Sequence, residues 1–110
     1  MTLNIALNYG GRQDLLQAVR KVVEDVQAGL LDKDDITCEE LAKRLYTEDI
    51  PDPDLLIRTS GEMRISNFLI WQCSYTEFYF SPVLWPDFSA KHLHEAIIEY
   101  QRRNRRFGGV

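Results

Sequence analysis

The alternation of short apolar runs with amphipathic helical segments constrains the fold of this chain more than any other feature. Residues 3–7 and 54–58 are short, mostly apolar runs typical of strands in a parallel sheet that is covered on both faces. The aromatic-rich run 77–80 predicts a third strand. Two helical segments lie between the first two runs. This order indicates an α/β fold with a parallel sheet flanked by helices.

The longest helix is predicted over residues 12–28, with Gly29 as its C-cap. Its apolar residues recur every three or four positions, so we expect one buried face made of Leu15, Leu16, Val19, Val22, Val23 and Val26. Thr37 and Glu40 match a capping box at the start of a second helix, which carries Leu41 and Leu45 on one side.

Two further helices are predicted in the second half of the chain. Ser66 is expected to cap a short helix that runs through Trp71 and Cys73. A last helix is expected from Ser89 to about Arg106, and its apolar side is marked by Leu93, Ile97 and Tyr100.

The composition narrows the functional classes. The chain has 110 residues, 45% of them hydrophobic and 27% charged, which suits one small globular domain. A net charge of -4 argues against a nucleic-acid binder held by bulk charge, and no apolar run approaches the length that spans a bilayer. Cys38 and Cys73 are far apart in the sequence, so free thiols are expected rather than a metal site.

The loop after residue 57 is the first candidate site, because ligands in open α/β sheets bind beyond the carboxyl ends of the strands. Arginine makes forked, charge-assisted hydrogen bonds to phosphate, and glycine lets backbone N–H groups approach it. The loop therefore suits a diphosphate, and its polar or small residues are Arg58, Thr59, Ser60, Gly61, Arg64 and Ser66. The alternative is a solvated loop whose arginines pair with acids such as Glu62.

Glu77 is the first residue of the aromatic run, where burying a charged side chain is costly unless the charge has a partner. It could bind magnesium, which favours a few carboxylates together with substrate phosphates, or it could be an edge carboxylate that faces water. His92 and His94 lie two apart on a helix and point to different faces, so a shared metal site is not expected there.

The C-terminal tail, residues 102–110, contains four arginines and no acidic residue. Three interpretations stay open at this point. The tail could be a solvated helix end that is favourable to the helix dipole, it could attract anionic lipid or nucleic acid, or it could reach a phosphate on a partner subunit.

Four stretches resemble the cis-prenyltransferase family, which is typified by undecaprenyl diphosphate synthase. The most specific is the run 53–72, Pro-Asp-Leu-Leu-Ile-Arg-Thr-Ser-Gly-Glu-Met-Arg-Ile-Ser-Asn-Phe-Leu-Ile-Trp-Gln. The others, in the family's order, are residues 3–12, residues 75–80 with 85–88, and residues 105–109. The resemblance covers essentially the whole chain and implies that residues 1–110 are the C-terminal portion of a single cis-prenyltransferase domain.

The resemblance assigns roles to individual residues. Arg58, Arg64 and Ser66 match positions that hold the diphosphate of isopentenyl diphosphate, and Ile65 would contribute its backbone. Glu77 matches a glutamate that binds Mg²⁺. Arg106 and Gly108 match an Arg-x-Gly motif that reaches across a dimer interface towards the homoallylic substrate.

The implied reaction joins isopentenyl diphosphate to an allylic diphosphate, usually farnesyl diphosphate, and repeats to build a long polyprenyl diphosphate. The implied enzyme is a magnesium-dependent homodimer. It makes a membrane lipid, the carrier used for cell walls, and binds no nucleic acid. We expect a cytoplasmic location, with peripheral attachment to the membrane as an open alternative.

The family's N-terminal strands and helices, which carry its aspartate motif, have no counterpart in these residues. We therefore expect a chain that is inactive alone, with no catalytic residue of its own. The main alternative is a non-catalytic partner subunit of a heteromeric enzyme, in which replacing Arg58 would leave the activity of the complex unchanged. A third hypothesis is a basic-tailed module that binds membranes or nucleic acid, with steeply salt-dependent binding.

Overall fold

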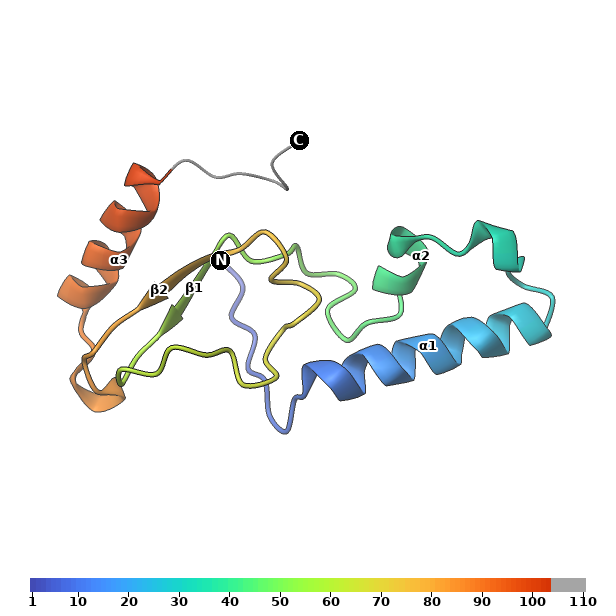
Figure 1. Ribbon diagram of the computed structural model, residues 1–110, viewed down its shortest axis with the longest axis horizontal. Coiled ribbons are helices and arrows are strands. Elements are labelled where there is room, and N and C mark those ends of the chain that lie inside the picture. The colour runs from blue at the N-terminus through green and yellow to red at the C-terminus, as the bar shows by residue number, and fades with distance from the viewer. Residues whose placement is uncertain (104–110) are drawn as a thin grey trace. The chain divides into compact units, whose positions relative to one another are not determined.

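The structure, a computed structural model, describes residues 1–103 and divides into two compact units. The first comprises Met1–Pro51 and Asn67–Trp71, and the second comprises Asp52–Ser66 and, within the described part of the chain, residues 72–103. The elements in chain order are α1 (Gly11–Gln27), the 3₁₀ turn η1 (Lys33–Asp35), α2 (Cys38–Ala42), β1 (Leu55–Arg58), β2 (Glu77–Phe80), the 3₁₀ turn η2 (Trp85–Asp87) and α3 (Ala90–Arg102) (Figure 1).

Helix α1 begins and ends within one residue of the prediction. It ends in a Schellman motif, since the Gly29 N–H donates to the Val26 carbonyl (3.2 Å) and the Leu30 N–H donates to the Asp25 carbonyl (2.9 Å). Gly29 has φ +75°, a left-handed conformation that glycine adopts without steric cost. The sequence-based assignment of Gly29 to the end of this helix is therefore confirmed.

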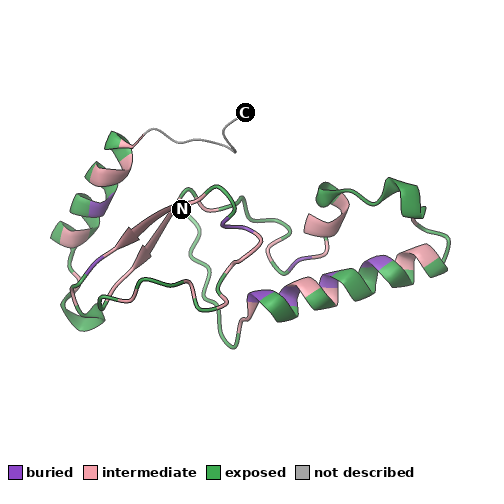
Figure 2. Ribbon diagram, viewed as in Figure 1, coloured by how far each residue is buried: buried purple, intermediate pink, exposed green. Residues whose placement is uncertain are grey.

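The buried face of α1 differs from the predicted one. Its buried residues are Gly11, Asp14, Ala18 and Val22, whereas Leu16, Val19 and Val23 are exposed (Figure 2). The prediction counted apolar residues only. In the structure, small side chains and one carboxylate with hydrogen-bond partners face the segment around α2 and the buried Leu45.

Helix α2 is short and is held by polar contacts at both ends. The Thr37 hydroxyl accepts a hydrogen bond from the Glu40 N–H (3.1 Å), as the capping pattern predicted. The Glu40 carboxylate pairs with Lys43 (3.0 Å) and Arg44 (3.1 Å), and these hydrogen bonds lower the pKa of Glu40. Arg44 also pairs with Asp25 of α1 at 2.7 Å, which joins the two helices.

The second unit contains a parallel pair of strands. Leu55 is in register with Glu77, and Arg58 is in register with Phe80 (Figure 1). Both strands match their predicted positions, and the parallel pairing confirms the α/β class. Helix α3 lies against β2 through Ala96, which is fully buried, whereas Leu93 and Ile97 are exposed. The predicted apolar side is therefore only partly correct: Tyr100 is half-buried, but the residue that is fully buried on this side is the small Ala96.

Helix α3 also ends earlier than predicted, at Arg102 rather than near Arg106. Arg103 is extended (ψ 142°), and its Nη1 donates a hydrogen bond to the Phe78 carbonyl of β2 at 2.6 Å. A backbone in this conformation ends the helix, so the prediction is wrong at Arg103, and its last residues, 104–106, lie outside the described residues.

The predicted strand over residues 3–7 does not form. These residues have no regular secondary structure, and Leu3, Ile5 and Leu7 are 75–82% exposed. A strand needs a neighbour to pair its backbone groups, and within residues 1–103 the only strands that pair are β1 and β2. The apolar pattern alone therefore predicted a strand that does not form in this structure.

The predicted helix from Ser66 through Cys73 is also wrong. This segment is a series of turns. Three of its residues, Ser66, Asn67 and Leu69, have φ values of +49°, +65° and +48°. Left-handed residues cannot continue a right-handed helix, so no helix start lies behind Ser66 to offer backbone donors.

Candidate functional site

The loop that leaves the carboxyl end of β1 is anchored on the chain that follows β2. The Ser81 N–H donates to the Arg58 carbonyl (2.8 Å), the Ser60 N–H donates to the Val83 carbonyl (2.8 Å), and the Gly61 N–H donates to the Ser81 carbonyl (2.9 Å). Ser60 and Gly61 both have positive φ, 67° and 72°, which turns the loop sharply. The loop therefore starts from a fixed backbone.

The Arg58 side chain links the end of β1 to residues 64 and 66, later in this loop. Its Nη1 donates hydrogen bonds to the carbonyl oxygen of Arg64 and to the Ser66 hydroxyl, the latter at 2.9 Å. Within residues 1–103, Arg58 forms no ion pair with a carboxylate. The Arg58 guanidinium thus contacts two other predicted site residues, Arg64 and Ser66.

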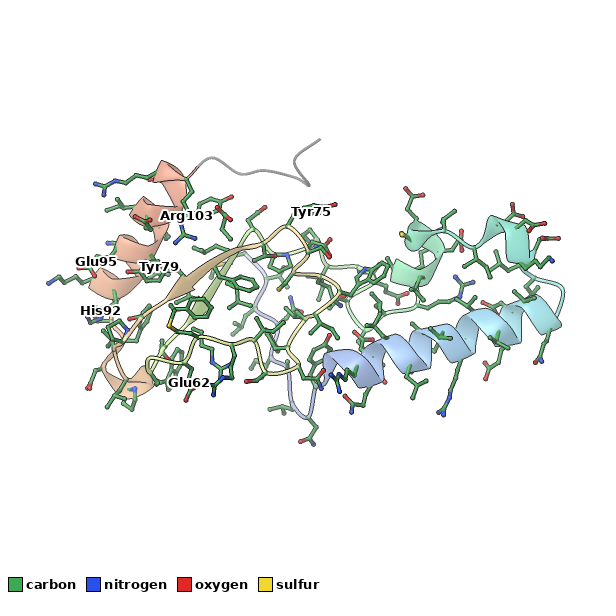
Figure 3. All side chains as sticks on the ribbon, in the orientation of Figure 1. Glu62, Tyr75, Tyr79, His92, Glu95 and Arg103 are labelled. Atoms are coloured by element: carbon green, nitrogen blue, oxygen red, sulfur yellow. The ribbon has the colours of Figure 1, made fainter. Side chains whose placement is uncertain are left out.

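Arg64 points its own guanidinium towards Glu62. The two groups form an ion pair at 3.0 Å, with the Arg64 side chain 73% exposed, and Figure 3 shows Glu62 on this loop. The alternative that the arginines of this solvated loop pair with acidic residues therefore holds for Arg64 and not for Arg58. An exposed pair of this kind contributes about 0–1 kcal/mol, so Arg64 can exchange Glu62 for another anion at little cost.

Ile65 and Ser66 complete the candidate site. Ile65 is half-buried and lies between Arg64 and Ser66 in the sequence, while Ser66 is exposed. The Arg58 guanidinium, the Ser66 hydroxyl and the loop backbone thus lie together at the carboxyl end of β1. That donor set suits a compact anion with several oxygens, such as a phosphate or diphosphate.

The whole chain matches one protein-family model. The model described as "Putative undecaprenyl diphosphate synthase" matches residues 1–108. The chain belongs to this prenyltransferase family. The family resemblance predicted from the four sequence stretches is thereby confirmed.

Curated members of the prenyltransferase family align along the full chain. It is 54% identical over 110 residues to the isoprenyl transferase of Clostridium tetani. It is 57% identical over 110 residues to a ditrans,polycis-undecaprenyl-diphosphate synthase, described as (2E,6E)-farnesyl-diphosphate specific, of Pasteurella multocida. The alignments cover 100% of this chain and 43% and 46% of those proteins, so the chain spans less than half the length of these relatives.

Solved structures of the prenyltransferase family share the fold. Lavandulyl diphosphate synthase from Lavandula x intermedia, in complex with dimethylallyl diphosphate, superposes with a TM-score of 0.89 and 47% identity, covering 94% of this chain and 44% of that one. A probable undecaprenyl diphosphate synthase from Campylobacter jejuni gives 0.77 and 36%, with coverage of 94% and 45%. The α/β fold with a parallel sheet is thus the family's fold.

Glu77 lies at the other end of the strand pair from the loop. It is half-buried at the first residue of β2, in register with Leu55, whereas Arg58 is in register with Phe80. Three residues of strand separate the two ends by roughly 10 Å. Within residues 1–103 no three histidine, cysteine or acidic residues group as metal ligands. Glu77 therefore lies at the opposite end of the strand pair from the loop of its own chain.

The predicted tail residues Arg106 and Gly108 lie outside the described residues. Arg103, which the sequence analysis placed in the basic tail, instead ties the end of α3 to β2 and lies 3.5 Å from Glu99 (Figure 3). No described helix is both long enough and apolar enough to cross a membrane.

Proposed function

We propose that this chain supplies the isopentenyl-diphosphate-binding part of a cis-prenyltransferase, with Arg58, Arg64, Ile65 and Ser66 holding the diphosphate. The observation that carries the proposal is the hydrogen bonding of Arg58 to the Arg64 carbonyl and the Ser66 hydroxyl at the carboxyl end of β1. Membership of the prenyltransferase family supports the choice of a prenyl diphosphate over other phosphorylated ligands.

Arg58 has donors to spare for this task. Among the described residues only its Nη1 is engaged, which leaves the N–H groups on Nε and Nη2 for phosphate oxygens. Two parallel N–H donors bind an oxyanion in a forked geometry that lysine cannot reproduce. Arg58 would thus shape the loop and bind the ligand at the same time.

The proposed reaction begins when an allylic diphosphate loses its diphosphate. The double bond of isopentenyl diphosphate attacks the first carbon of the allylic chain, and a proton is then lost to leave a cis double bond. The role of this chain is to hold isopentenyl diphosphate by its diphosphate and so to orient its double bond. Positioning of this kind replaces the entropy cost of a bimolecular encounter.

We expect Arg64→Ala to raise the KM for isopentenyl diphosphate by roughly 10- to 100-fold, the range of one charge-assisted hydrogen bond. The assay uses a chimera in which this chain replaces the matching segment of the Clostridium tetani relative, with farnesyl diphosphate as co-substrate. Arg20→Ala, an exposed arginine of α1, is the matched control and should leave the KM unchanged. An unchanged KM in Arg64→Ala would count against the diphosphate role.

For magnesium, we propose a limited role in which Glu77 supplies one carboxylate and the remaining ligands come from outside residues 1–103 of this chain. A single carboxylate completed by other oxygens is a set that magnesium accepts. In the chimera, Glu77→Gln should raise the magnesium concentration needed for half-maximal activity and leave the KM for isopentenyl diphosphate at saturating magnesium unchanged. A magnesium requirement equal to that of the parent would refute this role.

We also propose that the enzyme is a homodimer in which the tail residues Arg106 and Gly108 act at the partner's site. Its product would be a membrane lipid and its location the cytoplasm. We expect this chain to be inactive when it is alone. Of these proposals, the family match supports the lipid product. The competing role, a non-catalytic partner subunit, predicts that Arg58→Ala leaves the activity of a heteromeric complex intact. The free donors of Arg58 favour the substrate-binding role.

A further inference from the structure

The chain that follows β2 contains a short turn, residues 81–83, that a buried side chain holds together. Ser81 is 4% exposed, and its hydroxyl accepts a hydrogen bond from the Val83 N–H at 3.2 Å. A serine hydroxyl that bonds the backbone two residues later takes the place of a backbone hydrogen bond in a turn. Pro82 has no N–H, so the Val83 N–H is the first backbone donor after Ser81 that this hydroxyl can bind.

This turn presents two carbonyl groups to the loop after β1. The Ser60 N–H donates to the Val83 carbonyl (2.8 Å), and the Gly61 N–H donates to the Ser81 carbonyl (2.9 Å). The N–H groups of two consecutive loop residues are therefore both bound by the turn. The shape of the turn, which the Ser81 hydroxyl maintains, thus determines how the loop leaves β1.

The loop backbone at this contact has an unusual conformation. Ser60 and Gly61 have φ values of +67° and +72°, both in the left-handed region. A Cβ atom added to Gly61 would have no atom of residues 1–103 within 4 Å, so the conformation, and not a lack of space, favours glycine here. Serine adopts this conformation at a cost and keeps it where surrounding contacts hold it. The hydrogen bonds from the turn are such contacts.

The same loop carries the groups proposed to bind the diphosphate. Only two residues separate Gly61 from Arg64. Arg58 contacts the later part of the loop, at the Arg64 carbonyl and the Ser66 hydroxyl. The direction of the chain at Gly61 therefore decides whether this later part of the loop lies within reach of Arg58.

We propose that Ser81 is a positioning residue of the candidate diphosphate site. Its hydroxyl holds the turn at residues 81–83, and the turn holds the left-handed backbone of Ser60 and Gly61. Ser81 acts through this backbone on Arg64 and Ser66 and does not touch the ligand. The inference rests on the proposed function, since it assigns Ser81 to the binding of the same diphosphate.

Two substitutions at Ser81 test the hydroxyl. Ser81→Ala removes it and leaves the half-buried Val83 N–H without this acceptor. Ser81→Thr keeps a hydroxyl that can form the same turn, so it should restore most of the function.

Two substitutions at Gly61 disturb the same contact from the loop side. Gly61→Ala adds one methyl group into open space, so its effect comes from the left-handed φ alone. Gly61→Asn adds a larger side chain, but asparagine tolerates this conformation better than alanine does. The smaller residue should therefore have the larger effect.

The measurement is the KM for isopentenyl diphosphate in the chimera with the Clostridium tetani relative, together with kcat and the KM for farnesyl diphosphate. We expect the KM for isopentenyl diphosphate to rise about fivefold in Ser81→Ala and less than about twofold in Ser81→Thr, as the loss of one hydrogen bond implies. It should rise about tenfold in Gly61→Ala and about threefold in Gly61→Asn. The kcat and the KM for farnesyl diphosphate should stay near the parent's values.

A control at the other end of the strand pair separates positioning from stability. The Thr76 hydroxyl donates a hydrogen bond to the Pro53 carbonyl at 2.6 Å, just before β2 begins. Thr76→Val removes this bond and should lower Tm without changing the KM for isopentenyl diphosphate. The inference is overturned if Ser81→Ala behaves like this control, or if Ser81→Thr and Ser81→Ala raise the KM equally.

Comparison with Arg58→Ala distinguishes failure of this inference from failure of the proposed function. If Arg58→Ala raises the KM while Ser81→Ala and Gly61→Ala do not, the positioning role fails alone. If none of the three raises it, the proposed function fails too. Where Ser81→Ala does not fold, the two Gly61 variants decide: a larger rise in Gly61→Ala than in Gly61→Asn supports the inference, and equal values overturn it.

Discussion

Replacing Arg58 by alanine should weaken the binding of isopentenyl diphosphate by about a hundredfold or more. The substitution removes the proposed forked contact with the diphosphate, and a hydrogen bond to a charged group contributes about 1.5–3 kcal/mol. It also releases the Arg64 carbonyl and the Ser66 hydroxyl, which Arg58 gathers in the structure. The effect should therefore exceed that of Arg64→Ala, which removes one exposed side chain.

Titration calorimetry on the chimera with the Clostridium tetani relative measures this effect directly. Arg58→Lys keeps the charge but not the fork, so it should recover only part of the affinity. Arg20→Ala serves again as the matched arginine control. A dissociation constant that is the same in Arg58→Ala and in the parent would show that the diphosphate binds elsewhere.

The largest expected effect on stability comes from Asp14, the carboxylate buried on α1. Its Oδ1 accepts hydrogen bonds from the Tyr46 N–H (2.9 Å) and Gln17 Nε2 (3.1 Å), and its Oδ2 accepts one from the Tyr9 hydroxyl (3.1 Å). Asp14→Ala would remove this acceptor from all three donors, although Gln17 Nε2 keeps its bond to the Arg44 carbonyl (2.6 Å), and each buried group that stays unpaired costs about 1–3 kcal/mol. We expect a loss of roughly 3 kcal/mol in the free energy of unfolding.

Urea denaturation of the full chain tests this prediction. Asp14→Asn keeps the Oδ1 acceptor, and the Tyr9 hydroxyl can rotate to accept from the new amide, so the loss should be only about 1 kcal/mol. Asp34→Ala, at an exposed aspartate of η1, should leave the midpoint nearly unchanged. Equal losses in Asp14→Asn and Asp14→Ala would mean that charge, rather than the hydrogen bonds, stabilises this site.

The elements that could be predicted from the sequence are those whose signals are local. The apolar runs of β1 and β2 and the periodicity of α1 each lie within one segment, as do the cap at Thr37 and the glycine at position 29. Each of these signals acts through contacts a few residues apart, and each appears in the structure close to its predicted position.

The errors arose where distant contacts decide the conformation. The turns after Ser66 contain left-handed residues held by contacts with α1, and no local pattern marks them. The helix faces that pack closely use Ala18 and Ala96, while larger apolar residues stay exposed. A prediction that ranks residues by hydrophobicity misses these small residues, since close approach of two backbones favours small side chains.

The candidate site was predicted in composition but not in geometry. The arginines and the serine after β1 were named from their chemistry and from the family resemblance, and the structure brings Arg58, Ser66 and the Arg64 backbone together. The separation of Glu77 from this loop follows from strand register, which the sequence did not define.

A crystal structure of the chimera with bound isopentenyl diphosphate would show whether the loop after β1 binds the diphosphate. We expect diphosphate oxygens at about 2.7–2.9 Å from guanidinium nitrogens of Arg58 and Arg64, with the Ser66 hydroxyl in the same cluster of donors. We also expect Arg64 to leave Glu62 on binding. A diphosphate bound away from this loop, with Arg64 still paired with Glu62, would rule out the proposed role of these residues.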